Sequence, residues 1–417
     1  MSDQLWPAKA TNAVTWFGLS SVIIFLPVFY SASFDKFQIG ILTAIPCVSA
    51  LIAPPLWGAV ADVLQQQRTV HVFCIVTGAV LMFAIQYAVP TSFVLTCAVV
   101  FAANIQSTTT RSMLDQAVMA LVKRIGGEYG KQRLFGAVGW GLGAFLTGVV
   151  VNAYGIHWIF TLHLAVTLPS IGLLQLIPAP TPPATSPSAT KSTATLSFAD
   201  GMRRVVRQPD VLLLLTVVLL LGSMFGVLSS FLGLYLYELS ANDSTLVGTA
   251  VWVQTLSELP AFYFATALTK RYGIVRILFL SILAYGVRIS YYAVVVHPWT
   301  VLPFELLHGV TFAFSWAACT QYVYDAAPPG TEGTMMGLLN AMLNGLGRGA
   351  GTLLGGYLFQ THGARAMWWA TDMGVPLALI ALFFFARSLP LTETHHQSSA
   401  VMINLREDQP LVVDEMP

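Results

Sequence analysis

Six ionisable side chains lie inside apolar stretches of the second half of the chain. They are Glu258, Arg288, Glu305, His308, Arg348 and Asp372. An ionisable group inside a bilayer is costly and by default marks a functional site with a partner of opposite charge. Glu305 and His308 are three residues apart and therefore share one face of a helix. Histidine and buried carboxylates are the groups that exchange protons, so proton handling is the chemistry to consider first.

The charges of this set do not cancel unless a proton is added. Glu258, Glu305 and Asp372 are three negative groups, whereas Arg288 and Arg348 are two positive ones. A protonated His308 would balance the set, and a neutral His308 would leave an excess carboxylate inclined to bind a proton. We expect Glu258, Arg288, Glu305 and His308 to couple protons, with Arg348 and Asp372 as buried charge partners. Static ion pairs and direct binding of a charged substrate are the alternatives.

The first half carries almost no buried charge but several amides and aromatic rings. Its candidates for lining a substrate cavity are Trp16, Tyr30, Asn104, Gln106 and Trp140. Amides and indoles along a wet cavity suit a neutral, hydroxyl-rich or heteroaromatic substrate. Hydrogen bonding between helices is the alternative role for each of these residues.

A second group of charges flanks the apolar stretches of the first half. Asp62, Arg111, Asp115 and Arg133 fall near the ends of three such stretches. Gly58 precedes Asp62 by four residues, which suits a close helix contact followed by an ion pair. We expect these four residues to form a cytoplasmic gate, with solvated loop charges as the alternative.

Composition places these residues in a membrane. Charged residues make up 9% of the 417 residues, against about 25% in an ordinary soluble domain. Hydrophobic residues make up 56%, and the mean hydropathy is +0.70. The composition excludes a soluble enzyme, a nucleic-acid binder and a disordered chain. Cys47, Cys74, Cys97 and Cys319 show no metal or disulfide spacing, so we expect no cofactor, no metal and no enzymatic activity.

Twelve apolar runs are long enough to cross a bilayer, which needs about 20 residues. The runs lie at 11–33, 37–61, 70–89, 91–120, 134–153, 156–177, 211–237, 245–268, 274–296, 299–323, 333–360 and 365–387. Backbone in lipid must satisfy its own hydrogen bonds, so each run is expected to be a helix. Most Lys and Arg residues at or beyond the ends of the runs fall on the side of the termini, and only Lys36 and Arg365 fall on the other. Both termini are therefore expected to be cytoplasmic.

The chain repeats itself after 208 residues. Gly139, Gly143 and Gly155 then fall on Gly347, Gly351 and Gly363. The predicted fold is an all-α membrane protein of two pseudo-symmetric six-helix bundles, at 1–177 and 211–388. A cytoplasmic linker at 178–210, with a surface helix near its end, and a disordered tail at 389–417 complete it. Such repeats are typical of transporters that work by alternating access.

Several motifs resemble those of one transporter family. They are Gly58 to Asp62, Gly130 to Gly143, Ser257–Glu258–Leu–Pro260, Glu305 to Phe312 with Trp316, and Gly345 to Gly351. Together they resemble the "major facilitator superfamily associated domain" proteins, including the domain-containing protein 6 group. That branch is similar to lactose permease, phenylpropionate permease and nucleoside:proton symporters. Val63 to Gln67 replaces the basic second part of the family's loop signature, with only Arg68 basic.

The resemblance implies proton-coupled symport. We expect the protein to carry a small polar organic solute and to act as a monomer. In lactose permease, helices 8, 9 and 10 supply a Glu, an Arg and a His/Glu pair, and Glu258, Arg288 and His308 occupy matching helices. Glu305 precedes His308 here, in the reverse order. Asn104 and Trp140 lie where the galactoside-binding acid and Arg would be, so lactose is not expected.

A proton-independent uniporter and a non-transporting receptor or scaffold are the alternatives. The sequence leaves open the substrate, the coupling ion, the direction of transport and whether Asn242 is glycosylated. It also leaves open whether the plasma membrane or an organelle membrane holds the protein.

Overall fold

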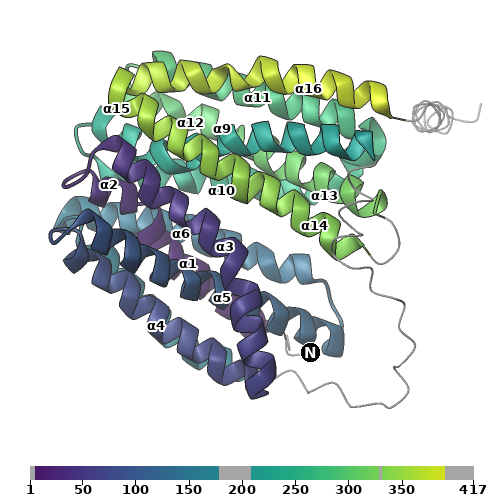
Figure 1. Cartoon of the computed structure of the whole chain (residues 1–417). Coiled ribbons are helices and arrows are strands. Elements are labelled where there is room, and N and C mark those ends of the chain that lie inside the picture. The colour runs from purple at the N-terminus through teal and green to yellow at the C-terminus, as the bar shows by residue number, and fades with distance from the viewer. Residues whose placement is uncertain (1–4, 178–207, 328–330, 390–417) are drawn as a thin grey trace, which may run out of the picture.

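A computed structural model describes residues 5–177, 208–327 and 331–389. Every regular element in these ranges is a helix, which confirms the all-α fold for this part of the chain (Figure 1). The linker predicted at 178–210 and the tail predicted at 389–417, apart from their first or last few residues, lie outside the described residues. So does the surface helix expected before residue 208.

The helices before residue 178 match the first six apolar runs, and the first two helices together cover the first run. Their bounds are α1 Trp6–Ile23, α2 Leu26–Tyr30, α3 Lys36–Leu64, α4 Gln67–Ala88, α5 Phe93–Ile125, α6 Tyr129–Tyr154 and α7 Trp158–Leu176. The start of α3 shows how local sequence sets a boundary. The Asp35 carboxylate accepts a hydrogen bond from the Gln38 N–H, and the Gln38 side chain accepts one from the Asp35 N–H. This reciprocal capping satisfies donors that a helix start leaves free.

The helices after residue 207 are more often interrupted. Their bounds are α9 Pro209–Leu239, α10 Ser244–Tyr272, α11 Ile274–Val294, η1 Pro298–Val301, α12 Leu302–Glu305, η2 Gly309–Phe314, α13 Ser315–Asp325, α14 Glu332–Asn340, η3 Ala341–Gly347, α15 Arg348–Asp372 and α16 Gly374–Ser388. Two of them, η2 and η3, are π-helical turns. Such turns inside longer helices are frequent at functional sites.

Ten of the described helical segments are long and apolar enough to span a membrane. One of them, Glu332–Ser388, has 57 residues and contains non-helical backbone at Gly363, where φ is +81°. It therefore includes both of the last two predicted runs. Helix α10, which carries Glu258, Lys270 and Arg271, is not among the ten. The total of twelve and the side of the termini stay predictions.

Glycines bring the fifth span of each half against the first span of the same half. A Cβ at Gly139 would lie 2.0 Å from the Ala13 backbone oxygen on α1. A Cβ at Gly351 would likewise lie 2.0 Å from the Ser223 oxygen on α9. Only glycine permits helices this close, as in other small-residue membrane interfaces. The glycines that repeat in the sequence thus serve the same packing in both halves.

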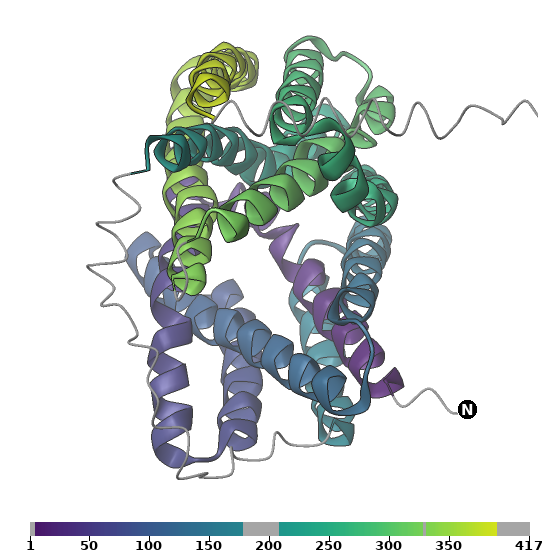
Figure 2. The ribbon, with the colours of Figure 1, turned by 90° about the vertical axis from the view of Figure 1, so that its right-hand side faces the viewer.

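The two halves meet mainly through two helix pairs, α3 with α15 and α6 with α10, and also where α2 packs on α9. We call the end where α1 begins and α16 ends the terminal end, and the opposite end the distal end. Seen from the terminal end, the helices before residue 178 lie below those after residue 208 (Figure 2). Near the distal end, Lys36 forms an ion pair with Glu238, and its N–H donates to Gln360 Oε1 at 2.9 Å.

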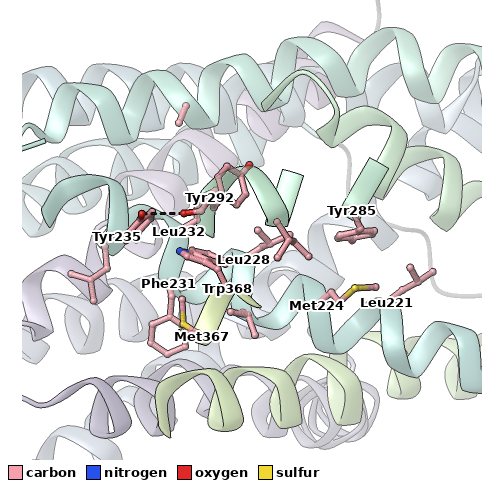
Figure 3. Packing of buried hydrophobic residues seen from close by; sticks show 14 of the residues in the cluster. Leu221, Met224, Leu228, Phe231, Leu232, Tyr235, Tyr285, Tyr292, Met367 and Trp368 are labelled. Atoms are coloured by element: carbon pink, nitrogen blue, oxygen red, sulfur yellow. Dashed lines mark hydrogen bonds between the residues drawn. The ribbon is translucent and has the colours of Figure 1, made fainter. Parts of the chain in front are cut away.

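The core of the second half is built around aromatic rings (Figure 3). Trp368 is fully buried and packs with its ring centroid 5.6 Å from that of Tyr235 and 5.3 Å from that of Tyr292. The Tyr235 hydroxyl donates to the Tyr292 backbone oxygen at 3.0 Å. These contacts hold α9, α11 and α15 together and fix the position of Tyr292.

At the interface between the halves, we expect the effect of one added methyl group on stability to depend on its position. A Cβ at Gly248 on α10 would lie 2.5 Å from the Ala144 backbone oxygen on α6. Gly248→Ala should therefore lower the stability by about 1–3 kcal/mol, as overpacking does. Thermal unfolding of the purified protein in detergent measures the change.

Gly172→Ala is the matched control, because a Cβ at Gly172 on α7 would meet nothing within 4 Å. It should raise the stability by roughly 0.5–1 kcal/mol through helix propensity. Equal effects of the two substitutions would contradict the close approach of α6 and α10.

Candidate functional site

Three helical segments of the second half bring four of the predicted proton-coupling residues into one connected group. Glu258 lies on α10, Arg288 on α11, and Glu305 and His308 on the interrupted helix that follows. Regular α-helix stops at Glu305, and the π-helical turn η2 begins directly after His308. The break turns both side chains toward α10 and α11.

Glycine and two hydroxyl groups allow this break beside α10. A Cβ at Gly309 would lie 2.4 Å from the Ser257 backbone oxygen, so only glycine fits there. The Gly309 N–H donates to Ser257 Oγ at 3.0 Å, and Ser281 Oγ donates to the Val310 oxygen at 2.8 Å. Backbone groups freed by a helix break in a membrane need such partners.

Arg288 and Glu305 form the buried centre of the group. Their side chains are 1% and 0% exposed, and Arg288 Nη2 lies 2.8 Å from Glu305 Oε2. Tyr292 donates to Glu305 Oε1 and Gln254 donates to Glu305 Oε2, each at 2.6 Å. A buried ion pair offsets its desolvation cost only when its remaining hydrogen-bonding sites are also filled. This carboxylate meets that condition with three donors.

His308 links this buried pair to Glu258. Arg288 Nη1 lies 3.1 Å from His308 Nδ1, and His308 Nε2 lies 2.8 Å from Glu258 Oε1. Guanidinium can only donate, so Nδ1 must accept and carries no proton. The ring proton is therefore on Nε2, directed at Glu258, and we assign His308 as the neutral imidazole. Glu258 and His308 are 19% and 11% exposed, so they form the accessible edge of the group.

Arg348 and Asp372 do not join this group as charge partners. Within the described ranges Arg348 makes no hydrogen bond or ion pair, and its guanidinium lies over the Phe225 ring at 5.5 Å. Asp372 accepts a hydrogen bond from Ser290 Oγ at 2.8 Å and pairs with no described cation. The prediction that they are partners is therefore corrected. Asp372 follows the break at Gly363, whereas Arg348 begins α15, so one helix carries them far apart.

Rings surround the accessible edge in the second half. The His308 imidazole stacks on Phe312 at 5.7 Å between centroids, and Phe312 stacks on Phe225 at 5.3 Å. The Arg348 guanidinium lies over the Phe225 ring. The sequence alone assigns no role to Phe225 or Phe312, because apolar rings in a membrane helix carry no signal of function by type alone.

The candidate cavity residues of the first half separate into two groups. Trp16 and Trp140 pack edge to face at 5.9 Å, and both are partly exposed, as is Gln106. Tyr30 is 1% exposed within an aromatic cluster, and Asn104 is 5% exposed and donates to the Val100 oxygen at 2.8 Å. Tyr30 and Asn104 therefore take part in helix packing in this structure, and their place on a cavity wall stays a prediction.

The predicted cytoplasmic gate is only partly assembled. Arg133 pairs with Asp115 at 3.2 Å, joining α6 to α5. Arg111 instead donates to Thr108 Oγ1 at 3.1 Å. Arg111 and Arg133 both lie over the Trp16 ring, at 6.0 and 5.3 Å. The Asp62 side chain lies outside the described residues.

All of these gate contacts lie inside the first half, so they do not tie the two halves together. Among the described residues, the ion pair that does so is Lys36–Glu238 at the distal end. In the sequence, Lys36 stands out as one of two basic residues expected on the side opposite the termini.

A cavity of about 190 Å³ lies within the first half, away from the residues predicted to couple protons. Arg68 and His71 line it, and Arg68 also donates to the Leu174 and Ile177 backbone oxygens at the end of α7. None of the predicted substrate-cavity residues lines it. Nowhere in the described ranges do three or more His, Cys, Asp or Glu side chains gather as metal ligands.

Sequence relatives of this chain are transporters. It is 26% identical to the maltose permease of Geobacillus stearothermophilus over 349 residues, which cover 84% of this chain and 86% of that one. It is 23% identical to the putative nucleoside transporter YegT of Escherichia coli over 94% of this chain and 95% of that one. The major facilitator superfamily domain-containing protein 6-like protein A of Xenopus laevis is 25% identical over 44% of this chain and 30% of its own length.

Solved structures show the same fold. The crystal structure of the nucleoside transporter NupG superimposes with a TM-score of 0.76 at 18% identity, covering 93% of this chain and 99% of that one. The profile of the "MFS_1 like family" matches residues 15–370. The chain is therefore a multi-pass membrane transporter of the major facilitator superfamily and belongs to its MFS_1 like family.

Proposed function

We propose that this protein couples proton binding to the transport of a small polar organic solute by alternating access. The observation that carries the proposal is the continuous chain Glu258–His308–Arg288–Glu305, which runs from a partly exposed carboxylate to a fully buried one. The permease and nucleoside transporter names of its relatives favour a sugar-like or nucleoside-like solute as the starting hypothesis.

Glu258 is the residue that we expect to take up the proton. Arg288 and Glu305 cancel each other's charge, and His308 is neutral in the tautomer assigned above. Glu258 then remains as an excess negative charge within the membrane, which favours its neutralisation. Glu305 is a poorer acceptor because it already receives three hydrogen bonds and has no exposed surface.

A proton on Glu258 acts on the helix that joins the two halves. Glu258 lies on α10, and the same helix packs on α6 through Gly248 and Gly148. Pro260 follows Glu258 by two residues and removes one backbone hydrogen bond, which makes α10 easier to bend. Neutralising Glu258 weakens its hold on His308 and so favours a rearrangement between α10 and its neighbours.

The proposal includes twelve spans with both termini in the cytoplasm. The bundles at 1–177 and 211–388 then move against each other about the solute. With the terminal end cytoplasmic, contact at the distal end through Lys36 and Glu238 makes this arrangement the inward-facing one.

A proton-independent uniporter is the second candidate. It would use the same buried charges as static ion pairs, and it fits the complete hydrogen bonding of Glu305. A receptor or scaffold that kept the fold remains the third.

Replacing Glu258 should separate the binding of solute from its coupling to protons. In proteoliposomes loaded with a pH-sensitive dye, Glu258→Gln should abolish alkalinisation driven by a transported solute. The glutamine keeps a hydrogen-bonding partner for His308 but cannot gain or lose a proton. Exchange of labelled solute across the membrane, which needs no net proton movement, should continue.

Asp372→Asn is the matched control, because it neutralises a carboxylate that lies outside the connected group. It should leave alkalinisation intact. Solute uptake by the wild-type protein that ignores an imposed pH gradient would reject coupling and support the uniporter.

The buried ion pair predicts a non-additive effect on stability. Glu305→Gln should lower the free energy of unfolding by about 3–5 kcal/mol, because it leaves the Arg288 cation unpaired and 1% exposed. The double variant Arg288→Met with Glu305→Leu should recover much of that loss while transport stays abolished. Unfolding midpoints in detergent measure the single and double variants. Effects of Arg288→Met and Glu305→Leu that simply add in the double variant would argue against a coupled pair.

A further inference from the structure

The cavity in the first half is bordered by a buried polar atom that lacks a partner. It lies at the terminal end, where α3, α4, α5 and the end of α7 meet, and its volume is about 190 Å³. His71 lines it and is 4% exposed, and its Nε2 has no hydrogen-bond partner among the described residues. A buried polar atom without a partner is costly, so its place beside a cavity points to a bound ligand. One water needs roughly 10–15 Å³, so the cavity has room for more than water.

The start of α4 brings positive charge to the same cavity. Arg68 lies in the first turn of α4 and is the charged residue among the described residues of the wall. Gln66, which precedes the helix, does not cap it with its side chain. An uncapped helix start offers its first N–H groups and the positive end of its dipole to an anion.

Arg68 also occupies the acceptors that border the cavity. Its Nη2 donates to the Leu174 oxygen at 3.2 Å and to the Ile177 oxygen, both at the end of α7. A helix end exposes carbonyl oxygens with partial negative charge, and Arg68 takes two of them. Its Nη1 and Nε donate to no described residue, so these N–H groups stay available to a ligand.

The walls from α3 and α5 supply space and further donors. Ser112 and Gln116 of α5 are four residues apart and therefore share the helix face that lines the cavity. Gly58 of α3 lines it as well, and a Cβ at Gly58 would meet nothing within 4 Å. The cavity thus combines a guanidinium, an imidazole, a hydroxyl and an amide with open space beside a glycine.

We propose that this cavity binds a small anion with a phosphate group at the start of α4, with Arg68 and His71 as its main donors. A phosphate group presents several acceptor oxygens, and guanidinium pairs with it well. A lipid headgroup and a soluble phosphate ester both carry this group. All described residues of the wall come from helices before residue 178, so the site is separate from Glu258 and its partners in the second half.

Probes that differ in the phosphate group test the proposal. The full-length protein in detergent is unfolded thermally with millimolar glycerol 3-phosphate or glycerol, at an ionic strength held constant with sodium chloride. A second arm uses nanodiscs of phosphatidylcholine with or without phosphatidic acid. A saturable rise of the unfolding midpoint with glycerol 3-phosphate but not with glycerol assigns a soluble ester. A rise with phosphatidic acid alone assigns a lipid headgroup, and either result supports the site.

Two variants locate the binding while Arg68, which also holds the end of α7, stays in place. His71→Leu removes the ring nitrogens, and Gly58→Leu fills the open space. Each should weaken the apparent affinity for the active phosphate probe by about 10-fold or more, as the loss of a charge-assisted hydrogen bond does. Gly172→Leu adds the same side chain at an exposed position of α7 that does not line the cavity, and it should bind as the wild type does.

Unfolding in phosphate-free buffer without any probe guards against misfolded variants. His71→Leu should unfold at the wild-type temperature or above it, because it replaces a buried polar atom that lacks a partner by an apolar group. A clearly lower midpoint would show that the protein itself satisfies the ring, and it would count against the site.

The proposal is overturned if neither glycerol 3-phosphate nor phosphatidic acid stabilises the protein. Stabilisation that rises without saturating would also overturn it, because the anion would then act through the solvent. So would wild-type affinity in both His71→Leu and Gly58→Leu. The experiment needs no transport, so failure of the proposed proton coupling would leave its outcome unchanged.

Discussion

The buried contact between Arg288 and Glu305 constrains the whole second half. Neither group has more than 1% of its surface exposed, so water cannot replace any missing partner. The contact therefore exists only if α10, α11 and the helix around Glu305 meet with Gln254 and Tyr292 in defined positions. Tyr292 is fixed in turn by Trp368 and Tyr235 in the aromatic core (Figure 3). Packing of apolar rings thus determines where a charge can be buried.

Arg288 also determines the chemistry of its neighbour. Because it donates to both Glu305 and His308, it anchors one carboxylate and dictates which nitrogen of His308 carries the proton. Glu258, at the edge of the group, is thereby left as the carboxylate that the proposed coupling would protonate. Arginine suits this anchoring position because it keeps its proton at any relevant pH.

The two halves share a fold but differ in the side chains that they present. Their fifth spans pack on their first spans through glycines at repeated positions, so the same helix arrangement arises twice. The second half adds π-helical turns beside His308 and Arg348, which change the direction of side chains that a regular helix would hold elsewhere. The described part of the first half has no π-helical turn, and it presents Trp16 with Arg111 and Arg133. The ionisable residues His308 and Arg348 thus lie where helices are interrupted.

The sequence alone determined the membrane environment, the helical fold and the family. Each follows from a local property: lack of charge, the length of apolar runs, and motifs such as Ser257 to Pro260. It also selected Glu258, Arg288, Glu305 and His308, because a charge in an apolar run is visible without a structure.

Only the tertiary structure decided how these groups pair. Helix rotation and crossing set which side chains meet, and no single run encodes either. For this reason Tyr30 and Asn104 proved to be buried, Arg348 and Asp372 proved to be apart, and Lys36 met Glu238. The cavity beside His71 is likewise a property of space, since it exists only when α3, α4, α5 and the end of α7 have been placed together.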